Sequence, residues 1–215
     1  MKTLNRRAIA LAVCLSALAG CVDAIGFLQL GGYFISFMSG NSTQMMVGLV
    51  AGQWLRVAQL AGILALFVTG TMAGTFAGHT GRMTRRGLRV LILVTGLLSA
   101  AAFSQIMGYS GVAIVFMTLA MGAENAVFQR DSDVVIGLTY MTGTLVKIGQ
   151  KLAMACLGEE GLGWVPYLLL WLGLICGGGV GAVLFNVMGL TSLWIVAGWA
   201  AILSLYAAIE KRSLA

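Results

Sequence analysis

Acidic and amide side chains stand at matching places in two stretches of an otherwise apolar chain. Gly20-Cys21-Val22-Asp23-Ala24 is echoed by Gly122-Ala123-Glu124-Asn125-Ala126. Roughly one helix length after each, a second polar group follows: Met38-Ser39-Gly40-Asn41 in the first stretch and Met141-Thr142-Gly143-Thr144 in the second. Duplicated polar breaks in apolar sequence are where membrane proteins usually build substrate sites. The repeated set therefore predicts a binding site.

Asp23 is the most informative single residue of this set. A carboxylate costs on the order of 2.5 to 3.5 kcal/mol at the centre of a membrane helix, and less toward the helix end. We therefore expect Asp23 to face the bundle interior and to have a partner. It could line a solute site, or it could make a structural hydrogen bond that holds the backbone of the following break.

Glu124 and Asn125 lie near the end of their apolar run, as Asp23 does in the first copy. Two interpretations of this pair are open. They could line the predicted site, or they could form a solvated helix end at the inner membrane face.

Ser39-Gly40-Asn41 has the residue types of a helix N-terminus, because Ser and Asn side chains accept hydrogen bonds from unpaired N–H groups. A helix is expected to start at about Asn41, and Thr142-Gly143-Thr144 predicts a similar start in the second copy. Two helix starts inside the membrane would point N–H groups and positive dipole ends into the protein. Such a site suits anions or carbonyl oxygens.

Lys147 and Lys151 share one helix face, since they are four residues apart. They could add positive charge on the cytoplasmic side of the predicted site, so Lys147 is included among its candidate residues. Alternatively, both lysines could simply extend to lipid headgroups.

Residues for catalysis or metal binding do not form a recognisable set, and we expect no enzyme and no cofactor. His79 is the only histidine and lies beside arginines, without a base and nucleophile pair. The inverted arrangement described below sets Asp23 and Glu124 toward opposite faces. The cysteines lack C-x-x-C spacing, which argues against zinc and against a disulfide framework.

Composition places these residues in an integral membrane protein. Of 215 residues, 60% are hydrophobic and 9% are charged, and the mean hydropathy is +0.96. Such a chain cannot cover a soluble surface with charge, so its first partner is the lipid bilayer. The net charge of +6 does not indicate nucleic acid, because the basic residues fall between hydrophobic segments. We expect one integral membrane domain over residues 1–215.

Six apolar runs are long enough to cross a bilayer, which takes roughly 20 helical residues. Two further segments are apolar but shorter or interrupted by polar residues, at about Gly40–Gly52 and Thr142–Gly158. The six long runs are at about Ala8–Leu28, Val57–Gly78, Arg89–Met107, Gly111–Phe128, Trp164–Val187 and Ser192–Ile209.

The distribution of Lys and Arg favours six crossings, because these residues concentrate in short cytoplasmic loops. With the N-terminus inside, six crossings leave only Arg56 on the outer side. Eight crossings would move the loop that carries Arg82, Arg85, Arg86 and Arg89 to the outer face. We therefore expect a multi-pass membrane protein with cytoplasmic N- and C-termini.

Six crossings divide into two repeats, at about residues 8–107 and 111–209. Three crossings in each repeat reverse the orientation of the second, so the repeats would be inverted. The predicted fold class is an all-α polytopic membrane protein with six transmembrane helices in two inverted three-helix repeats, each with a broken or re-entrant segment. Glycines spaced four apart support the repeat and indicate close packing, either within one subunit or in a homo-oligomer: Gly70, Gly74 and Gly78, then Gly173, Gly177 and Gly181.

The ordered set of motifs resembles the YoaK family of small bacterial inner-membrane proteins, a family with a domain of unknown function. The resemblance spans about Ala8 to Tyr206 and implies a polytopic protein of the bacterial inner (plasma) membrane without an assigned activity. Ser39 stands where the family more often has threonine, and Glu124 where glutamine is expected. The added carboxylate suggests a different dependence on ions or protons.

Two functions remain open on these grounds. The first is a transporter or channel for a small solute, with an anion among the candidates, in which Asp23, Asn41, Asn125 and Thr144 line a central site. The second is a membrane scaffold or partner-binding subunit, in which the same groups satisfy interrupted backbone.

Overall fold

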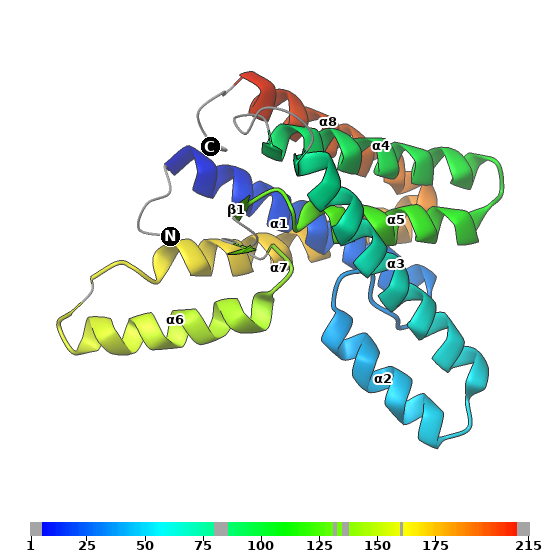
Figure 1. Cartoon of the computed structure of the whole chain (residues 1–215), viewed down its shortest axis with the longest axis horizontal. Coiled ribbons are helices and arrows are strands. Elements are labelled where there is room, and N and C mark those ends of the chain that lie inside the picture. Colours follow the sequence, from blue (N-terminus) through cyan, green and yellow to red (C-terminus); the bar gives the residue numbers. More distant parts are fainter. Residues whose placement is uncertain (1–5, 80–85, 131–132, 135–137, 160, 210–215) are drawn as a thin grey trace.

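Helices make up most of the computed structural model, which describes residues 6–79, 86–130, 133–134, 138–159 and 161–209 (Figure 1). Two short strands, β1 Gln129–Arg130 and β2 Asp133–Val134, pair antiparallel. The helices are α1 Arg6–Gln29, α2 Met38–Val50, α3 Trp54–His79, α4 Arg86–Ile106, α5 Ser110–Glu124, α6 Met141–Cys156, α7 Val165–Met188, the 3-10 helix η2 Gly189–Ser192, and α8 Leu193–Ile209.

The positions of these helices follow the apolar runs of the sequence. The six long runs correspond to α1, α3, α4, α5, α7 and α8, and the two shorter segments to α2 and α6. By length and composition, four stretches of the described residues could cross a membrane: Arg6–Gln29, Trp54–His79, Arg86–Ile106 and Val165–Ile209. The last stretch contains both α7 and α8, and α5 is apolar but shorter. The all-α, apolar character is therefore confirmed.

Glycine lets the chain reverse after α1. Gly31 and Gly32 have φ values of 66° and 116°, in the left-handed region that side chains with a Cβ avoid. The chain turns there and leads through residues 30–37 into α2 (Figure 1). We call residues 30–37 the first break and residues 138–140, which lead into α6, the second break.

The closest helix packing joins the two halves of the chain. α1 packs mainly against α7, and α5 packs against α3 and α4. A Cβ on Gly177 would overlap the carbonyl oxygen of Ala17, and a Cβ on Gly70 would overlap that of Leu119. The predicted glycine faces are confirmed as packing surfaces, where small residues let helix backbones approach.

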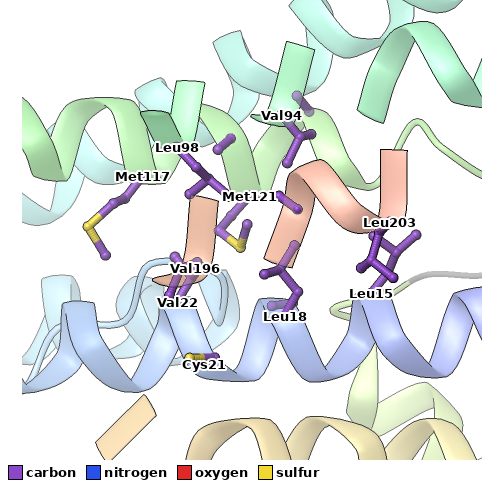
Figure 2. Close-up of a cluster of buried hydrophobic side chains, with 14 of the residues drawn as sticks. Leu15, Leu18, Cys21, Val22, Val94, Leu98, Met117, Met121, Val196 and Leu203 are labelled. Atoms are coloured by element: carbon purple, nitrogen blue, oxygen red, sulfur yellow. The ribbon is translucent and has the colours of Figure 1, made fainter. Parts of the chain in front are cut away.

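A dense apolar core lies between α1, α4, α5 and α8. Figure 2 shows side chains from these helices meeting there. Leu18, Val94, Met121 and Val196 are all fully buried in this cluster. Large apolar side chains on the outward faces of α3 and α7 remain exposed, among them Phe76 and Val183. An oily outer surface around an oily core is what a lipid environment requires.

The helices of the two halves run in opposite directions. In Figure 1, α1 and α5 are antiparallel, and so are α4 and α8. From near the middle of the molecule, α2 and α6 extend toward opposite ends. The start of α1 and the end of α8 lie at the same end of the bundle.

Candidate functional site

Asp23 holds the first break against α1. Its Oδ1 accepts hydrogen bonds from the backbone N–H groups of Ile35 and Ser36, each at 2.7 Å. Ile35 is fully buried, so this backbone is far from bulk solvent. Unpaired N–H groups at that depth would cost several kcal/mol in hydrocarbon, on the order of a lost hydrogen bond each. The hydrogen-bond partners expected for the buried Asp23 carboxylate are therefore present, and they are backbone N–H groups.

Asn41 holds the same break from the side of α2. Its Oδ1 accepts the N–H of Phe34 at 3.0 Å, and its Nδ2 donates to the carbonyl oxygen of Phe34 at 2.7 Å. The side chain is fully buried. Asp23 and Asn41 together satisfy three consecutive residues of irregular backbone.

The predicted helix start at Asn41 is wrong by three residues. α2 begins at Met38, and the N–H of Asn41 already bonds to the carbonyl oxygen of Phe37 at 3.2 Å. No side chain caps this helix end. Asn41 cannot act as the cap because both of its polar groups are occupied by Phe34. The two residues before Asn41 have different surroundings. Ser39 is exposed, whereas Gly40 lies so close to the Phe37 ring that a Cβ on it would overlap the ring.

Gln44 and Arg56 extend this network, which the sequence did not reveal. Gln44 Nε2 donates to the carbonyl oxygen of Gly32 at 3.1 Å, and its Oε1 accepts from Arg56 Nη2 at 2.7 Å. The Arg56 guanidinium lies 5.6 Å from the Tyr33 ring centroid, a cation–π distance. The sequence gives no signal for these contacts, because a single glutamine does not indicate partners twelve positions away.

Asn125 occupies the same place in the second half as Asp23 in the first. Its Oδ1 accepts from the Thr139 hydroxyl at 3.0 Å, and its Nδ2 donates to the carbonyl oxygen of Met121 at 3.0 Å. In the aligned repeats, Thr139 corresponds to Ser36, and Leu138 to Ile35. Leu138, like Ile35, is fully buried. The two breaks are therefore anchored by equivalent residues, Asp23 in α1 and Asn125 directly after α5.

Thr144 does not cap α6. The helix begins at Met141, and the Thr144 hydroxyl donates to the carbonyl oxygen of Tyr140 at 3.2 Å. The start predicted at Thr142-Gly143-Thr144 lies within one residue of the observed one, but no polar side chain caps this helix end. The Thr144 side chain is nonetheless buried.

Thr142, Gly143 and Lys147 lie on exposed faces of α6. No heavy atom would lie within 4 Å of a Cβ on Gly143. The Lys147 ammonium is 5.5 Å from the ring centroid of Tyr167 on α7. Among the candidate residues of the second half, Asn125 and Thr144 point inward and these three do not.

Glu124 is buried in full, and neither of its carboxylate oxygens has a hydrogen-bond partner in the described part of the chain. Asn125 beside it is 2% exposed. The interpretation of this pair as a solvated helix end is therefore wrong, because the end of α5 is enclosed by the bundle. Glu124 differs from the other buried candidates in lacking any polar neighbour within bonding distance.

The two breaks contact α1 at different levels. Ser16 donates to the carbonyl oxygens of Leu138 at 3.4 Å and Leu170 at 3.0 Å, whereas Asp23 binds the first break. Seven residues separate Ser16 from Asp23, which is about 10 Å along a helix. Among the described residues, no hydrogen bond joins the first break to the second. The two breaks thus contact α1 at separate positions.

Groups for catalysis or metal binding are not assembled in the described residues. His79 is exposed, and its Nδ1 lies 2.9 Å from the carbonyl oxygen of Thr75. Within the described ranges, no three histidine, cysteine or acidic side chains cluster. Cys14, Cys21, Cys156 and Cys176 are free thiols, of which only Cys21 is buried.

Known proteins are similar to this chain over most of its length. The family described as "Protein of unknown function (DUF1275)" matches residues 11–206. The UPF0700 transmembrane protein RA0705 of Rhizobium meliloti (strain 1021) is 37% identical over 187 residues, which cover 87% of this chain and 80% of the relative. The UPF0700 transmembrane protein YoaK of Bacillus subtilis (strain 168) is 26% identical over 144 residues, covering 63% of this chain and 62% of that relative. No solved structure is significantly similar.

Proposed function

Since this chain belongs to the DUF1275 family, whose relatives here are named transmembrane proteins, we propose that it is a membrane transporter or channel for a small solute. The family description assigns no activity, so the proposal depends on the site. The observation that carries it is the pair of equivalent breaks, each with irregular backbone and polar side chains inside an apolar bundle. Irregular backbone at membrane depth persists where protein or a water-filled path satisfies it.

The architecture that fits this role has six crossings in two inverted repeats, residues 8–107 and 111–209. The opposite directions of α1 and α5 support it, as do those of α4 and α8 (Figure 1). Packing between the two repeats supports it as well. α1 of the first repeat packs on α7 of the second, and α5 of the second repeat packs on α3 of the first. In this arrangement the breaks open toward opposite membrane faces, which is the geometry that alternating access uses.

The solute is a small molecule, with anions and carbonyl compounds favoured. The first turns of α2 and α6 begin near the middle of the molecule (Figure 1), and N–H groups at a helix start attract negative charge. The excess of Lys and Arg in the predicted inner loops favours the inner membrane, with both termini cytoplasmic.

Flux into proteoliposomes tests the proposal. Purified protein is assayed with panels of inorganic anions, carboxylates, cations and neutral metabolites, and we expect protein-dependent flux of at least one class. Thr144→Val, which keeps the shape of a buried side chain but removes its hydroxyl, is expected to reduce that flux about tenfold. Thr69→Val on the exposed face of α3 is the matched control and should leave it unchanged.

A membrane scaffold is the second candidate, and one observation favours it. Asp23 and Asn41 direct their side-chain hydrogen bonds to backbone groups of the first break, as a purely structural role would require. Absence of flux across all four panels, with folded protein in the vesicles, would establish this candidate over the transporter.

A further inference from the structure

Glu124 is a buried acid that neither proposed role explains. It closes α5, and the surrounding helices leave it no exposed surface. Both oxygens lack a hydrogen-bond partner in the described residues, whereas the buried Asn125 and Asn41 bond through both of their polar groups. Unsatisfied buried polar atoms are rare in proteins and often mark a functional role or a bound species that is not part of the chain.

A bare carboxylate in this position would be strongly destabilising. Removing an ion from water without a partner costs at least several kcal/mol, and in practice such a group neutralises instead. A proton bound to one carboxylate oxygen neutralises the charge by itself. A metal ion needs several oxygen ligands, and the described residues show no acidic cluster around Glu124.

Cationic side chains on the described helices that pack against α5 do not provide the missing charge. α5 packs against α1, α3 and α4, and the polar atoms of these helices form no hydrogen bond with either Glu124 oxygen. The titratable and charged groups of the three helices are Arg6, Arg7, Cys14, Cys21 and Asp23 on α1, Arg56 and His79 on α3, and Arg86 and Arg89 on α4. The carboxyl group is therefore left to bind a small mobile species.

Glu124 is also adjacent to the anchor of the second break. The next residue, Asn125, accepts the hydrogen bond from Thr139, and Leu138 of the same break is fully buried. The contact that anchors the second break therefore lies one residue from the buried acid.

We propose that Glu124 is a proton-binding site inside the membrane domain, gated by the second break. With the break packed as described, the carboxyl group carries its proton. When the Asn125–Thr139 contact opens, the O–H bond breaks, the proton passes to water, and the carboxylate remains. Coupling of this proton to solute movement rests on the proposed transport function, but the proton site itself does not.

Infrared spectroscopy of the full-length protein in lipid tests the site without any solute. A pH-difference spectrum should show a carboxylic acid C=O band that converts to carboxylate at high pH. We expect this band to be lost in Glu124→Gln and kept in Asp23→Asn. An unchanged band in folded Glu124→Gln, or only ionised carboxylates over the whole pH range, would overturn the proposal.

Transfer to D₂O tests the gate, since deuteration shifts the same band at a rate set by water access. Thr139→Val removes the hydroxyl that bonds to Asn125, and we expect several-fold faster exchange. Thr69→Val is the matched control and should keep the wild-type rate. Equal rates in both variants would show that the break does not gate the acid. A failure to detect solute flux would leave these results intact.

Discussion

Hydrogen bonds of single residues show how the apolar chain tolerates irregular backbone. Asp23 accepts two N–H groups of the first break, and Asn41 both donates to and accepts from Phe34. The second half differs, because Asn125 accepts a hydrogen bond from the Thr139 side chain and not from the backbone of the second break. The first break thus depends on Asp23 for two of its N–H groups.

Replacing Asp23 tests this dependence. Asp23→Ala leaves the N–H groups of Ile35 and Ser36 without their acceptor, and each such bond to a charged group is worth about 1.5 kcal/mol or more. We expect the free energy of unfolding to fall by about 3 kcal/mol. Asp23→Asn keeps an acceptor oxygen and should lose less. Thermal unfolding in detergent provides the measurement, and equal melting temperatures for Asp23→Ala and wild type would contradict the described contacts.

The residue types, but not their bonding, could be predicted from the sequence. An acid within an apolar run must find a partner, and Asp23 does. The partner could not be identified, because the chain reversal that returns Ile35 to α1 depends on backbone angles at Gly31 and Gly32. Glu124 is the opposite case, since its place near a run end suggested solvent and the packing of neighbouring helices encloses it.

At the scale of elements, the apolar runs predicted the helices well. Their ends were less accurate: α2 was expected to start at about Asn41 and begins three residues earlier, at Met38. α6 begins at Met141, one residue before the start predicted at Thr142-Gly143-Thr144. Capping preferences assume a helix end with free N–H groups in water. Here α2 and α6 become helical at Met38 and Met141 with no side-chain cap at either start, so the local signal was misleading.

Glycine spacing makes a testable prediction about helix packing. A Cβ on Gly177 would overlap the backbone of Ala17 on α1, whereas nothing lies within 4 Å of a Cβ on Gly179 in the same helix. Gly177→Ala should therefore lower the free energy of unfolding by about 1–3 kcal/mol through overpacking. Gly179→Ala should be neutral or raise it by up to about 1 kcal/mol, because alanine favours helix.

Thermal melting of the two variants in one detergent compares them directly. A drop confined to Gly177→Ala supports the packing of α1 on α7. Equal effects of the two substitutions would mean that these helices do not approach as described.

At the scale of the whole molecule, the central claim is that the two halves are inverted in the membrane. Composition alone establishes a lipid environment, and the family membership agrees with it. The orientation of the halves is a prediction from the distribution of arginines, and the antiparallel course of α1 and α5 supports it. Neither hydropathy nor spacing could predict that the helices of the two halves exchange partners, because packing between distant segments leaves no local pattern.

Cysteine labelling from each side of the membrane tests that claim most directly. Single cysteines at Ala51, after α2, and Leu162, before α7, both replace exposed residues and are introduced after the native cysteines are removed. An impermeant maleimide should label Ala51→Cys from the periplasmic side and Leu162→Cys only from the cytoplasmic side. Labelling of both positions from the same side would contradict the inverted arrangement and the transport path built on it.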